Sequence, residues 1–388
     1  MQKQTIRDVD VHTKRVLVRV DLNVPLDKVT GEVADDTRIR AVLPTIRMLQ
    51  EQNARIVLCS HLGRPDGRFV EGLRLAPVAR RLASLLGAAV ATSGDCVGDE
   101  TETAVAAIQP GGVLLLENLR FHPEEEQNDV AFARQLARLG DVYVNDAFGT
   151  AHRAHASTAG VAAFLPAVAG LLLEKELVFM GGALERPQRP FVAVLGGAKV
   201  TDKIKVVENL LPKVDTLVIG GGMANAFLVA EGTDVGASRV HPGDPNHARR
   251  ALDRAKQSHV KVLLPVDAVV ADRFERDAQH ATVPVDRVPS GWMILDIGPR
   301  SQQMYGAAVH DAKLVIWNGP MGVFEWPAFA TGTRSLAEAM GATSATTIVG
   351  GGETAQAVAE MGVADRISHV STGGGATLEF LEGRVLPG

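Results

Sequence analysis

The sequence predicts an α/β protein made of two doubly wound, Rossmann-like parallel-sheet domains joined by a linker helix. Two observations support this prediction. The chain has 388 residues, and a single hydrophobic core rarely grows beyond roughly 250–300 residues. Short, nearly continuous Val/Ile/Leu runs also alternate with helix-like segments from end to end, which is typical of parallel strands connected by crossover helices.

The apolar runs predict the strands in order along both halves. In the first half they are Arg15–Val20, Arg55–Cys59, Val113–Leu116 and Val142–Val144. In the second half they are Phe191–Leu195, Thr216–Ile219, Lys261–Leu264, Trp292–Ile297, Lys313–Trp317 and Thr346–Val349. We expect all of them in parallel sheets, with helices between them at segments such as Leu75–Leu86 and Asp129–Leu139.

A further helical segment, Leu171–Met180, separates the two halves. It carries charged residues within an apolar frame, and we expect the glycine pair Gly181-Gly182 to end it. The predicted organisation is therefore residues 1–170 for the first domain, 171–183 for the linker and 184–370 for the second domain.

Composition excludes several classes of partner. The net charge is -5 and 46% of residues are apolar, so neither nucleic acid nor an anionic membrane is an expected partner. The run Val161–Leu173 contains Pro166 and is too short to span a bilayer, which needs ~20 apolar residues. Two cysteines do not make a disulfide framework, and the N-terminus lacks a signal peptide's apolar core. We expect a cytoplasmic protein.

Ligands of open parallel sheets bind beyond the carboxyl ends of the strands. In the first half, these ends run into polar side chains and arginines. The residues after these ends include Asp21, Asn23, His61, Arg64, Arg120 and Arg153, and Arg38 lies in a separate stretch before a helix, so the four arginines could converge on one crevice. Guanidinium groups bind phosphate and carboxylate bidentately, so a shared crevice would suit a small, multiply charged anion. Any one of these arginines, taken alone, is better explained as a surface residue.

In the second half, the strands run into glycine clusters. They are Gly196-Gly197-Ala198-Lys199, Gly220-Gly221-Gly222, Asn318-Gly319-Pro320, Gly350-Gly351-Gly352-Glu353-Thr354 and Gly373-Gly374-Gly375. Glycine lets backbone N–H groups approach phosphates at helix N-termini, so a nucleotide is one interpretation and tight turns are the other. The P-loop pattern, the protein-kinase motifs and the G-x-G-x-x-G fingerprint are missing, and no Cys/His/Glu set has metal-ligand spacing.

The motifs taken together resemble those of the phosphoglycerate kinase family. The blocks occur in family order from Arg19 to Glu379: RVDLNVP, DDTRI, SHLGRP, ENLRFH, VNDAFGTAHRAHAST, GGAKVTDKI, GGGMANAF, GPMGVFEW, GGGET and VSTGGGATLE. Two positions depart from the usual pattern, with Leu22 in place of Phe and Glu353 in place of Asp. The resemblance implies two domains facing a cleft, a C-terminal segment 371–388 that returns to the first domain, and a monomer.

The resemblance also implies the activity and the roles of the site residues. The activity is reversible phosphoryl transfer between ATP and the carboxylate of 3-phosphoglycerate, with Mg²⁺ held near Glu353 and hinge closure near the linker. The implied acid-binding residues are Asp21, Asn23, Arg38, His61, Arg64, Arg120 and Arg153. The implied catalytic residues are Arg38, Lys199, Lys203, Gly351 and Gly374. The implied nucleotide-binding residues are Gly196, Gly197, Ala198, Lys203, Gly220, Gly221, Asn318, Pro320, Val323, Glu325, Gly350, Gly351, Gly352, Glu353 and Thr354.

Three alternatives remain at this point. A kinase acting on another phosphorylated or dicarboxylic acid would use the same arginines. A non-catalytic relative would bind nucleotide without turnover, although Arg38, Lys199 and Lys203 are all present. A nicotinamide dehydrogenase is disfavoured by the missing fingerprint.

Overall fold

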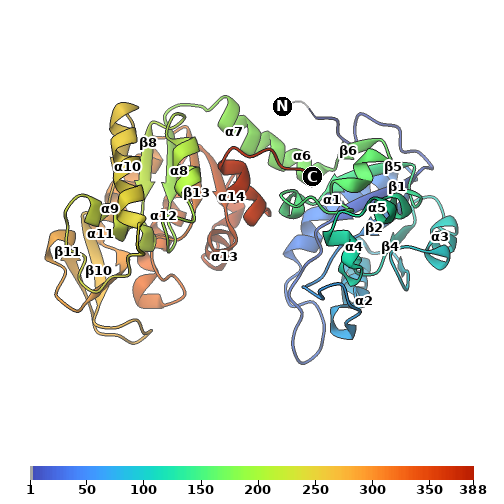
Figure 1. Cartoon of the computed structure of the whole chain (residues 1–388), viewed down its shortest axis with the longest axis horizontal. Coiled ribbons are helices and arrows are strands. Elements are labelled where there is room, and N and C mark those ends of the chain that lie inside the picture. Colours follow the sequence, from blue (N-terminus) through green and yellow to red (C-terminus); the bar gives the residue numbers. More distant parts are fainter. Residues whose placement is uncertain (1–2) are drawn as a thin grey trace. The chain divides into compact units, whose positions relative to one another are not determined.

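A computed structural model describes residues 3–388 and divides them into two compact units (Figure 1). The first unit runs up to Val178 and includes Leu386–Gly388, whereas the second unit comprises Phe179–Val385. Each unit contains a six-stranded parallel sheet, so the predicted α/β class with two parallel sheets is confirmed.

The sheet of the first unit has the strand order β3-β4-β2-β1-β5-β6. Its strands are β1 Arg15–Val20, β2 Arg55–Cys59, β3 Val90–Thr92, β4 Val113–Leu115, β5 Val142–Asp146 and β6 Ala167–Ala169. Its helices are α1 Thr37–Glu51, α2 Ala76–Leu86, α3 Asp99–Ala106, α4 Pro123–Glu126, α5 Val130–Ala137 and α6 Leu171–Glu176. Short 3-10 turns lie at Glu71–Leu73, Leu119–Phe121, Phe148–Thr150 and Gly160–Ala163.

Alternate residues along these strands bury against opposite layers of helices, as side chains of period two must. Val16 and Val18 of β1 pack in the same hydrophobic cluster as α1 and α2. Leu17, between them, packs in the cluster that contains α3 and α5. The sheet is therefore covered on both faces, which explains why its strands read as continuous apolar runs.

The second unit repeats this design with the strand order β15-β14-β13-β7-β8-β9. The strands are β7 Phe191–Leu195, β8 Thr216–Ile219, β9 Lys261–Leu263, β13 Leu314–Asn318, β14 Thr346–Gly350 and β15 His369–Val370. The helices are α7 Gly182–Glu185, α8 Ile204–Leu210, α9 Gly221–Ala230, α10 Asp244–Gln257, α11 Pro299–His310, α12 Thr331–Ala342, α13 Gly352–Glu360 and α14 Gly375–Leu381. Helices α8, α9, α10 and α14 share one core cluster, and α11, α12 and α13 share the other.

A second, antiparallel sheet corrects one strand prediction. The run expected at Trp292–Ile297 forms β12, Met293–Ile297, which pairs antiparallel with β10, Asp267–Ala271. Strand β10 in turn pairs antiparallel with β11, His280–Pro284. The loop 272–279 between β10 and β11 is too short for the crossover that parallel pairing requires, so these two strands pair antiparallel. The three strands form a sheet separate from the six-stranded one.

The linker differs from its prediction in one respect. Helix α6 continues through a π-helical stretch at Leu177–Gly181 into α7, so the glycine pair does not end the helix. Gly181 has φ −66° and ψ −46°, whereas a glycine that ends a helix adopts the left-handed conformation. The two units divide inside this π-helical stretch.

No helix among residues 3–388 is both long enough and apolar enough to cross a bilayer.

Candidate active site

The predicted acid-binding residues of the first unit follow strands that are neighbours in its sheet. Strands β4, β2, β1 and β5 lie side by side and run parallel, so their carboxyl ends share one edge. Asp21 follows β1, His61 follows β2, Arg120 lies in the 3-10 turn after β4, and Arg153 lies in the loop beyond β5.

Hydrogen bonds hold several of these side chains in place. The Arg38 guanidinium, from the first turn of α1, donates to Asp21 Oδ2 at 2.5 Å. The Gly63 N–H donates to Asn23 Oδ1 at 2.9 Å. Arg120 is 5% exposed and donates to the Gly63 carbonyl at 2.9 Å. These bonds tie the loops after β1, β2 and β4 to one another.

His61 lies where the cations meet. It is 4% exposed, and its pKa lies well below the usual value, first because of burial and then because of the nearby charges of Arg19, Arg120, Arg38 and Arg153. Burial, reinforced by Arg153 and Arg19, lowers the pKa of Arg120 although Glu126 opposes this. The structure thus gathers Arg38, Arg120 and Arg153 around one imidazole. Arg64 is exposed and is not among the charges acting on His61.

Beneath these residues lies a buried polar layer that sequence reasoning missed. Arg19 is 1% exposed and Glu125 is fully buried. The Arg19 Nε donates to Ser157 Oγ at 2.8 Å, and Ser157 donates to Glu125 through both Oγ, at 2.5 Å, and its N–H, at 2.9 Å. Burial raises the pKa of Glu125, against the opposing effect of Arg19. The available signal was one charge inside the apolar run VLVRV of β1.

In the second unit, glycine loops line a pocket of about 540 Å³. The predicted nucleotide-binding residues that line it are Gly197, Ala198, Gly221, Pro320, Val323, Glu325 and Glu353. Sequence reasoning missed Arg239, Phe274 and Asp296, which also line it and lie away from the strand-end glycines. It also missed Asn225, which lines the pocket from α9 just after Gly222. Burial raises the pKa of Asp296 to about 7.

Two of the glycines are required by close packing between loops. Gly221 has φ +64°, and a Cβ there would lie 2.6 Å from the Gly197 nitrogen. A Cβ on Gly196 would lie 2.1 Å from the Pro320 carbonyl oxygen. By contrast, a Cβ on Gly352, at the start of α13, would meet nothing within 4 Å. Packing between the loops therefore requires glycine at Gly196 and Gly221, whereas Gly352 borders open space.

Three predicted residues, Lys203, Asn318 and Thr354, take part in hydrogen bonds that connect the loops around the pocket. Lys203 Nζ donates to the carbonyl oxygens of Gly196, at 2.7 Å, and Asn318, at 2.9 Å. Burial lowers the pKa of Lys203 to about 8, while Glu353 and Asp202 act in the opposite direction. Thr354 Oγ1 is fully buried and accepts from the Gly319 N–H at 2.7 Å. These bonds join the ends of β7, β13 and β14.

The other predicted residues differ in exposure, and Gly220 and Gly350 are buried. Lys199, Glu325 and Glu353 are exposed. Gly351, with φ +91°, precedes α13, and Gly374, with φ +50°, precedes α14. Gly220 ends the loop before α9, and Gly350 is the last residue of β14.

The donor set suits a magnesium ion that is held mainly by ligand phosphates. Glu353 offers an exposed carboxylate in the first turn of α13 and lines the pocket. Its negative charge acts to raise the pKa of Lys203. Mg²⁺ is commonly bound by one or two carboxylates together with substrate phosphates, so this residue fits that role. A separate group, Asp95, Cys96 and His122, has ligand atoms within 4.8 Å of one another. There His122 Nε2 already pairs with Asp95 at 2.6 Å, and burial raises the pKa of the Cys96 thiol well above its usual value, so the group needs no ion.

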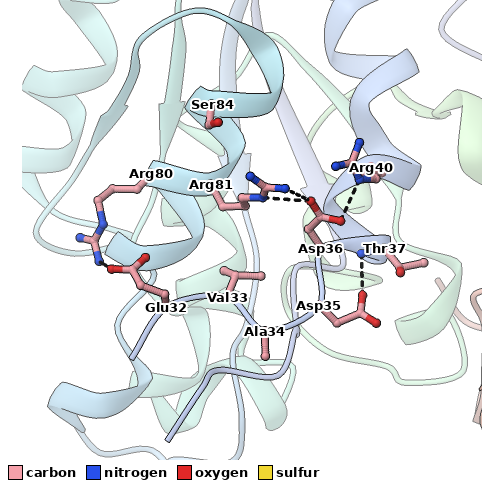
Figure 2. Close-up of a pocket in the computed structure, with 10 residues that line it drawn as sticks. All are labelled: Glu32, Val33, Ala34, Asp35, Asp36, Thr37, Arg40, Arg80, Arg81 and Ser84. Carbon is pink, nitrogen blue, oxygen red and sulfur yellow. Dashed lines mark hydrogen bonds and ion pairs between the residues drawn. The ribbon is translucent and has the colours of Figure 1, made fainter. Parts of the chain in front are cut away.

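A larger depression, of about 790 Å³, lies in the first unit beside the start of α1. Figure 2 shows the residues that line it. Arg40 and Arg81 converge there on the Asp36 carboxylate, at 2.8 and 2.5 Å, and Arg80 pairs with Glu32 at 2.7 Å. The Arg40 hydrogen bond contributes most to lowering the pKa of Asp36. Because these charges are matched within the lining, we assign no ligand site to this depression.

The fold and the two sites define a class of α/β protein in which one unit presents clustered arginines and the other presents a glycine-walled pocket. Residues 6–384 match the model of the phosphoglycerate kinase family. The chain is 60% identical over 388 residues to the phosphoglycerate kinase of Moorella thermoacetica, covering 100% of this chain and 98% of that relative. The corresponding protein of Herpetosiphon aurantiacus is 59% identical over 388 residues with the same coverage.

Solved structures agree with the sequence comparison. The phosphoglycerate kinase of Coxiella burnetii superposes with a TM-score of 0.91 at 43% identity, covering 100% of this chain and 97% of that one. The enzyme of Pyrococcus horikoshii gives a TM-score of 0.85 at 34% identity, covering 99% and 97%. The chain belongs to the phosphoglycerate kinase family.

Proposed function

We propose that this chain catalyses reversible, Mg²⁺-dependent phosphoryl transfer between ATP and the carboxylate of 3-phospho-D-glycerate. The products are ADP and 1,3-bisphosphoglycerate, a step of glycolysis and gluconeogenesis. The observation that carries the proposal is the gathering of Arg38, Arg120 and Arg153 around His61 in a chain that belongs to this family. Several guanidinium groups at one site suit a small acid that carries both phosphate and carboxylate.

In this proposal the first unit binds the acid. Its ligand set is the predicted one: Asp21, Asn23, Arg38, His61, Arg64, Arg120 and Arg153. The bond from Arg38 to Asp21 supports a pre-oriented guanidinium, and the bond from Arg120 to Gly63 does the same for its neighbour. Pre-orientation matters because side chains that are already fixed lose little conformational entropy on binding.

The second unit binds ATP or ADP in the glycine-walled pocket, with Glu325 accepting from the ribose and Asn318, Pro320 and Val323 bordering the adenosine. The phosphates lie toward Lys203, Gly352 and Glu353. Glu353 would hold Mg²⁺ together with the phosphates, and the bound ion would neutralise charge on the phosphate oxygens. The open space at Gly352 supports an approach of phosphate to the N–H groups that begin α13.

No nucleophilic side chain or general base is needed, because the attacking carboxylate or diphosphate oxygen is already ionised. Catalysis then rests on positioning and on charge stabilisation. We assign Arg38 and Lys199 to the equatorial oxygens of the transferring group, with N–H donors at Gly351 and Gly374. A single well-placed donor of this kind is worth ~3–4 kcal/mol, or about a hundred- to a thousandfold in rate.

The acid and nucleotide sites lie on different units, and in-line transfer needs the reacting oxygens within ~3–3.5 Å of phosphorus. We therefore propose hinge closure that flexes near the linker helix and excludes water. The π-helical stretch at Leu177–Gly181 supports this location, because such stretches often mark functional sites in helices. Small-angle scattering should show compaction with both substrates present, and an unchanged radius of gyration would contradict closure.

A coupled assay tests the activity directly. With 3-phosphoglycerate, MgATP and glyceraldehyde-phosphate dehydrogenase, NADH should be consumed only when all components are present. A panel of unphosphorylated and dicarboxylic acids should give far lower rates. Comparable rates with another acid would establish a different carboxylate kinase, and nucleotide binding without turnover would establish a non-catalytic relative. We also propose a cytoplasmic monomer, which light scattering after gel filtration and cell fractionation would test.

A further inference from the structure

The imidazole of His61 has one ring nitrogen engaged by a buried cation. The Arg19 Nη2 lies 3.2 Å from His61 Nδ1, and both side chains are almost fully buried, at 1% and 4% exposure. A guanidinium group carries five N–H donors and no acceptor. A hydrogen bond between these two atoms therefore requires Nδ1 to be the acceptor, which means that Nδ1 carries no proton.

We propose that Arg19 is a positioning residue that holds His61 in the neutral form with its proton on Nε2, so that His61 offers the acid substrate one uncharged N–H donor. This inference rests on the proposed function for the identity of the substrate. It does not rest on that function for the protonation state, which follows from the contact with Arg19.

Arg19 is itself fixed by bonds on every side. Its Nε donates to Ser157 Oγ at 2.8 Å, and its Nη1 donates to the Val20 carbonyl. The main chain of Arg19 is also held in the sheet, in register with Cys59 of β2 and Asn145 of β5. Because these bonds fix the guanidinium, rotation of the imidazole would break its hydrogen bond with Arg19. The Arg19 guanidinium therefore sets the orientation of the His61 ring.

The free side of the ring is available to a ligand. Within residues 3–388, His61 Nε2 makes no hydrogen bond. It is also absent from the set of buried polar atoms without a partner, so this nitrogen is accessible. The charges that lower the pKa of the ring are Arg19 from β1, Arg38 from α1, Arg120 from the turn after β4 and Arg153 from the loop beyond β5, and Asp21 is paired with Arg38. A second proton on His61 would add a charge to this group, so the neutral donor persists across the physiological pH range.

The ligand atom facing Nε2 must then be an acceptor, such as a carboxylate, hydroxyl or phosphate oxygen. Because His61 binds without gaining charge, its contribution to acid binding should not change between about pH 6 and about pH 8. A histidine that lacked the Arg19 contact would lie closer to its ordinary pKa of about 6.5. Such a histidine would bind the acid more tightly as the pH falls.

Nitrogen-15 NMR of the imidazoles tests the protonation state in the unmodified protein without any substrate. The His61 signals are assigned as those missing from the His61→Gln spectrum. We expect an unprotonated Nδ1 and a protonated Nε2 throughout about pH 6–8. A proton on Nδ1, or an imidazolium at about pH 6, would overturn the proposal whatever the enzyme's activity. The expected protonation of His61 without any turnover of 3-phosphoglycerate would overturn the proposed function alone.

Kinetics test the consequence for binding. Arg19→Met should raise the KM for the acid by about tenfold, equivalent to ~1.4 kcal/mol, with little change in kcat or in the nucleotide KM. The ratio of variant to wild-type acid KM should fall as the pH drops from about 8 to about 6. Arg19→Lys retains a donor at this position and should recover part of the affinity.

The matched control is Arg15→Met, the same substitution in the same strand, at an arginine that pairs with Asp141 instead. It should leave both KM values unchanged. A loss of kcat in Arg19→Met with an unchanged acid KM, or a pH-independent ratio, would mean that Arg19 serves folding alone and would refute its positioning role. If Arg19→Met does not fold, Arg19→Lys and the wild-type NMR spectrum still test whether Arg19 positions His61.

Discussion

Gly221 and Gly352 both belong to loops predicted to bind the nucleotide, yet the structure separates their roles. A Cβ on Gly221 would lie 2.6 Å from the Gly197 nitrogen and 2.7 Å from the Pro320 oxygen. These are backbone atoms that cannot swing aside. A Cβ on Gly352 would meet nothing within 4 Å. We predict that Gly221→Ala damages the fold of the second unit, whereas Gly352→Ala damages nucleotide binding and leaves the fold intact.

The size of the first effect follows from two costs. Placing an L-residue at φ +64° costs roughly 1–2 kcal/mol, and overpacking a filled site costs typically ~1–3 kcal/mol. Together they predict a loss of about 3 kcal/mol, or a fall of roughly 6–12 °C in Tm for a domain of this size. Gly352→Ala should change stability by no more than about 1 kcal/mol, in the stabilising direction, because alanine restricts the unfolded chain.

Tryptophan fluorescence is a suitable probe because all three tryptophans, Trp292, Trp317 and Trp326, lie in the second unit. Thermal and urea unfolding would be followed for both variants, together with the nucleotide KM. Unchanged unfolding of Gly221→Ala would refute the packing argument. It would mean that the glycine is needed there for ligand approach alone. An unchanged nucleotide KM in Gly352→Ala would contradict phosphate binding at the start of α13.

Three further predictions concern single charges. Arg38→Ala should reduce kcat by at least a hundredfold while changing the nucleotide KM little; equal losses in both would count against a role in the transition state. Glu325→Ala should raise the nucleotide KM about tenfold in steady-state assays and spare the acid KM, and a change confined to the acid would contradict the assignment of sites to units. Burial raises the pKa of Asp146 to about 6 although Leu172 and Leu173 donate to it. A carboxyl whose folded pKa exceeds its unfolded value of about 3.9 binds its proton more tightly when folded, so its contribution to stability falls by roughly 3 kcal/mol as pH rises from about 4 to about 6. In calorimetry, Asp146→Asn should gain stability relative to the wild type as the pH rises from about 4.5 to about 7.5; a constant difference between these pH values would show that Asp146 does not titrate in this range.

Much of the fold was predictable because its strands are buried on both faces. Runs such as Arg15–Val20 and Phe191–Leu195 have strand bounds identical to those predicted. Strand direction was not predictable in the same way. The apolar run of β12 looks like that of a parallel strand, but its pairing with β10 is antiparallel. Short and partly exposed strands such as β3, Val90–Thr92, carry too weak an apolar signal to be found.

The site was predictable where residues follow strand ends and unpredictable where they act from beneath or from afar. Asp21 and His61 could be placed by their positions after β1 and β2. Glu125 could not, because its partner Ser157 lies 32 residues away along the chain. Phe274 reaches the glycine-walled pocket from the loop after β10, and no local pattern connects that loop with the glycine clusters.

The charges of the proposed acid site bear on how the site can exist before substrate arrives. Four guanidinium groups act on His61, and mutual repulsion would spread them apart in water. Asp21 restrains Arg38, Glu126 restrains Arg120 at 3.1 Å, and the buried Glu125 offsets Arg19 through Ser157. Arg153 is half-buried and lies among cations without an ion pair in the described chain. An arriving dianion would therefore meet a site with a deficit of negative charge, so its own charge would stabilise the arrangement that binds it.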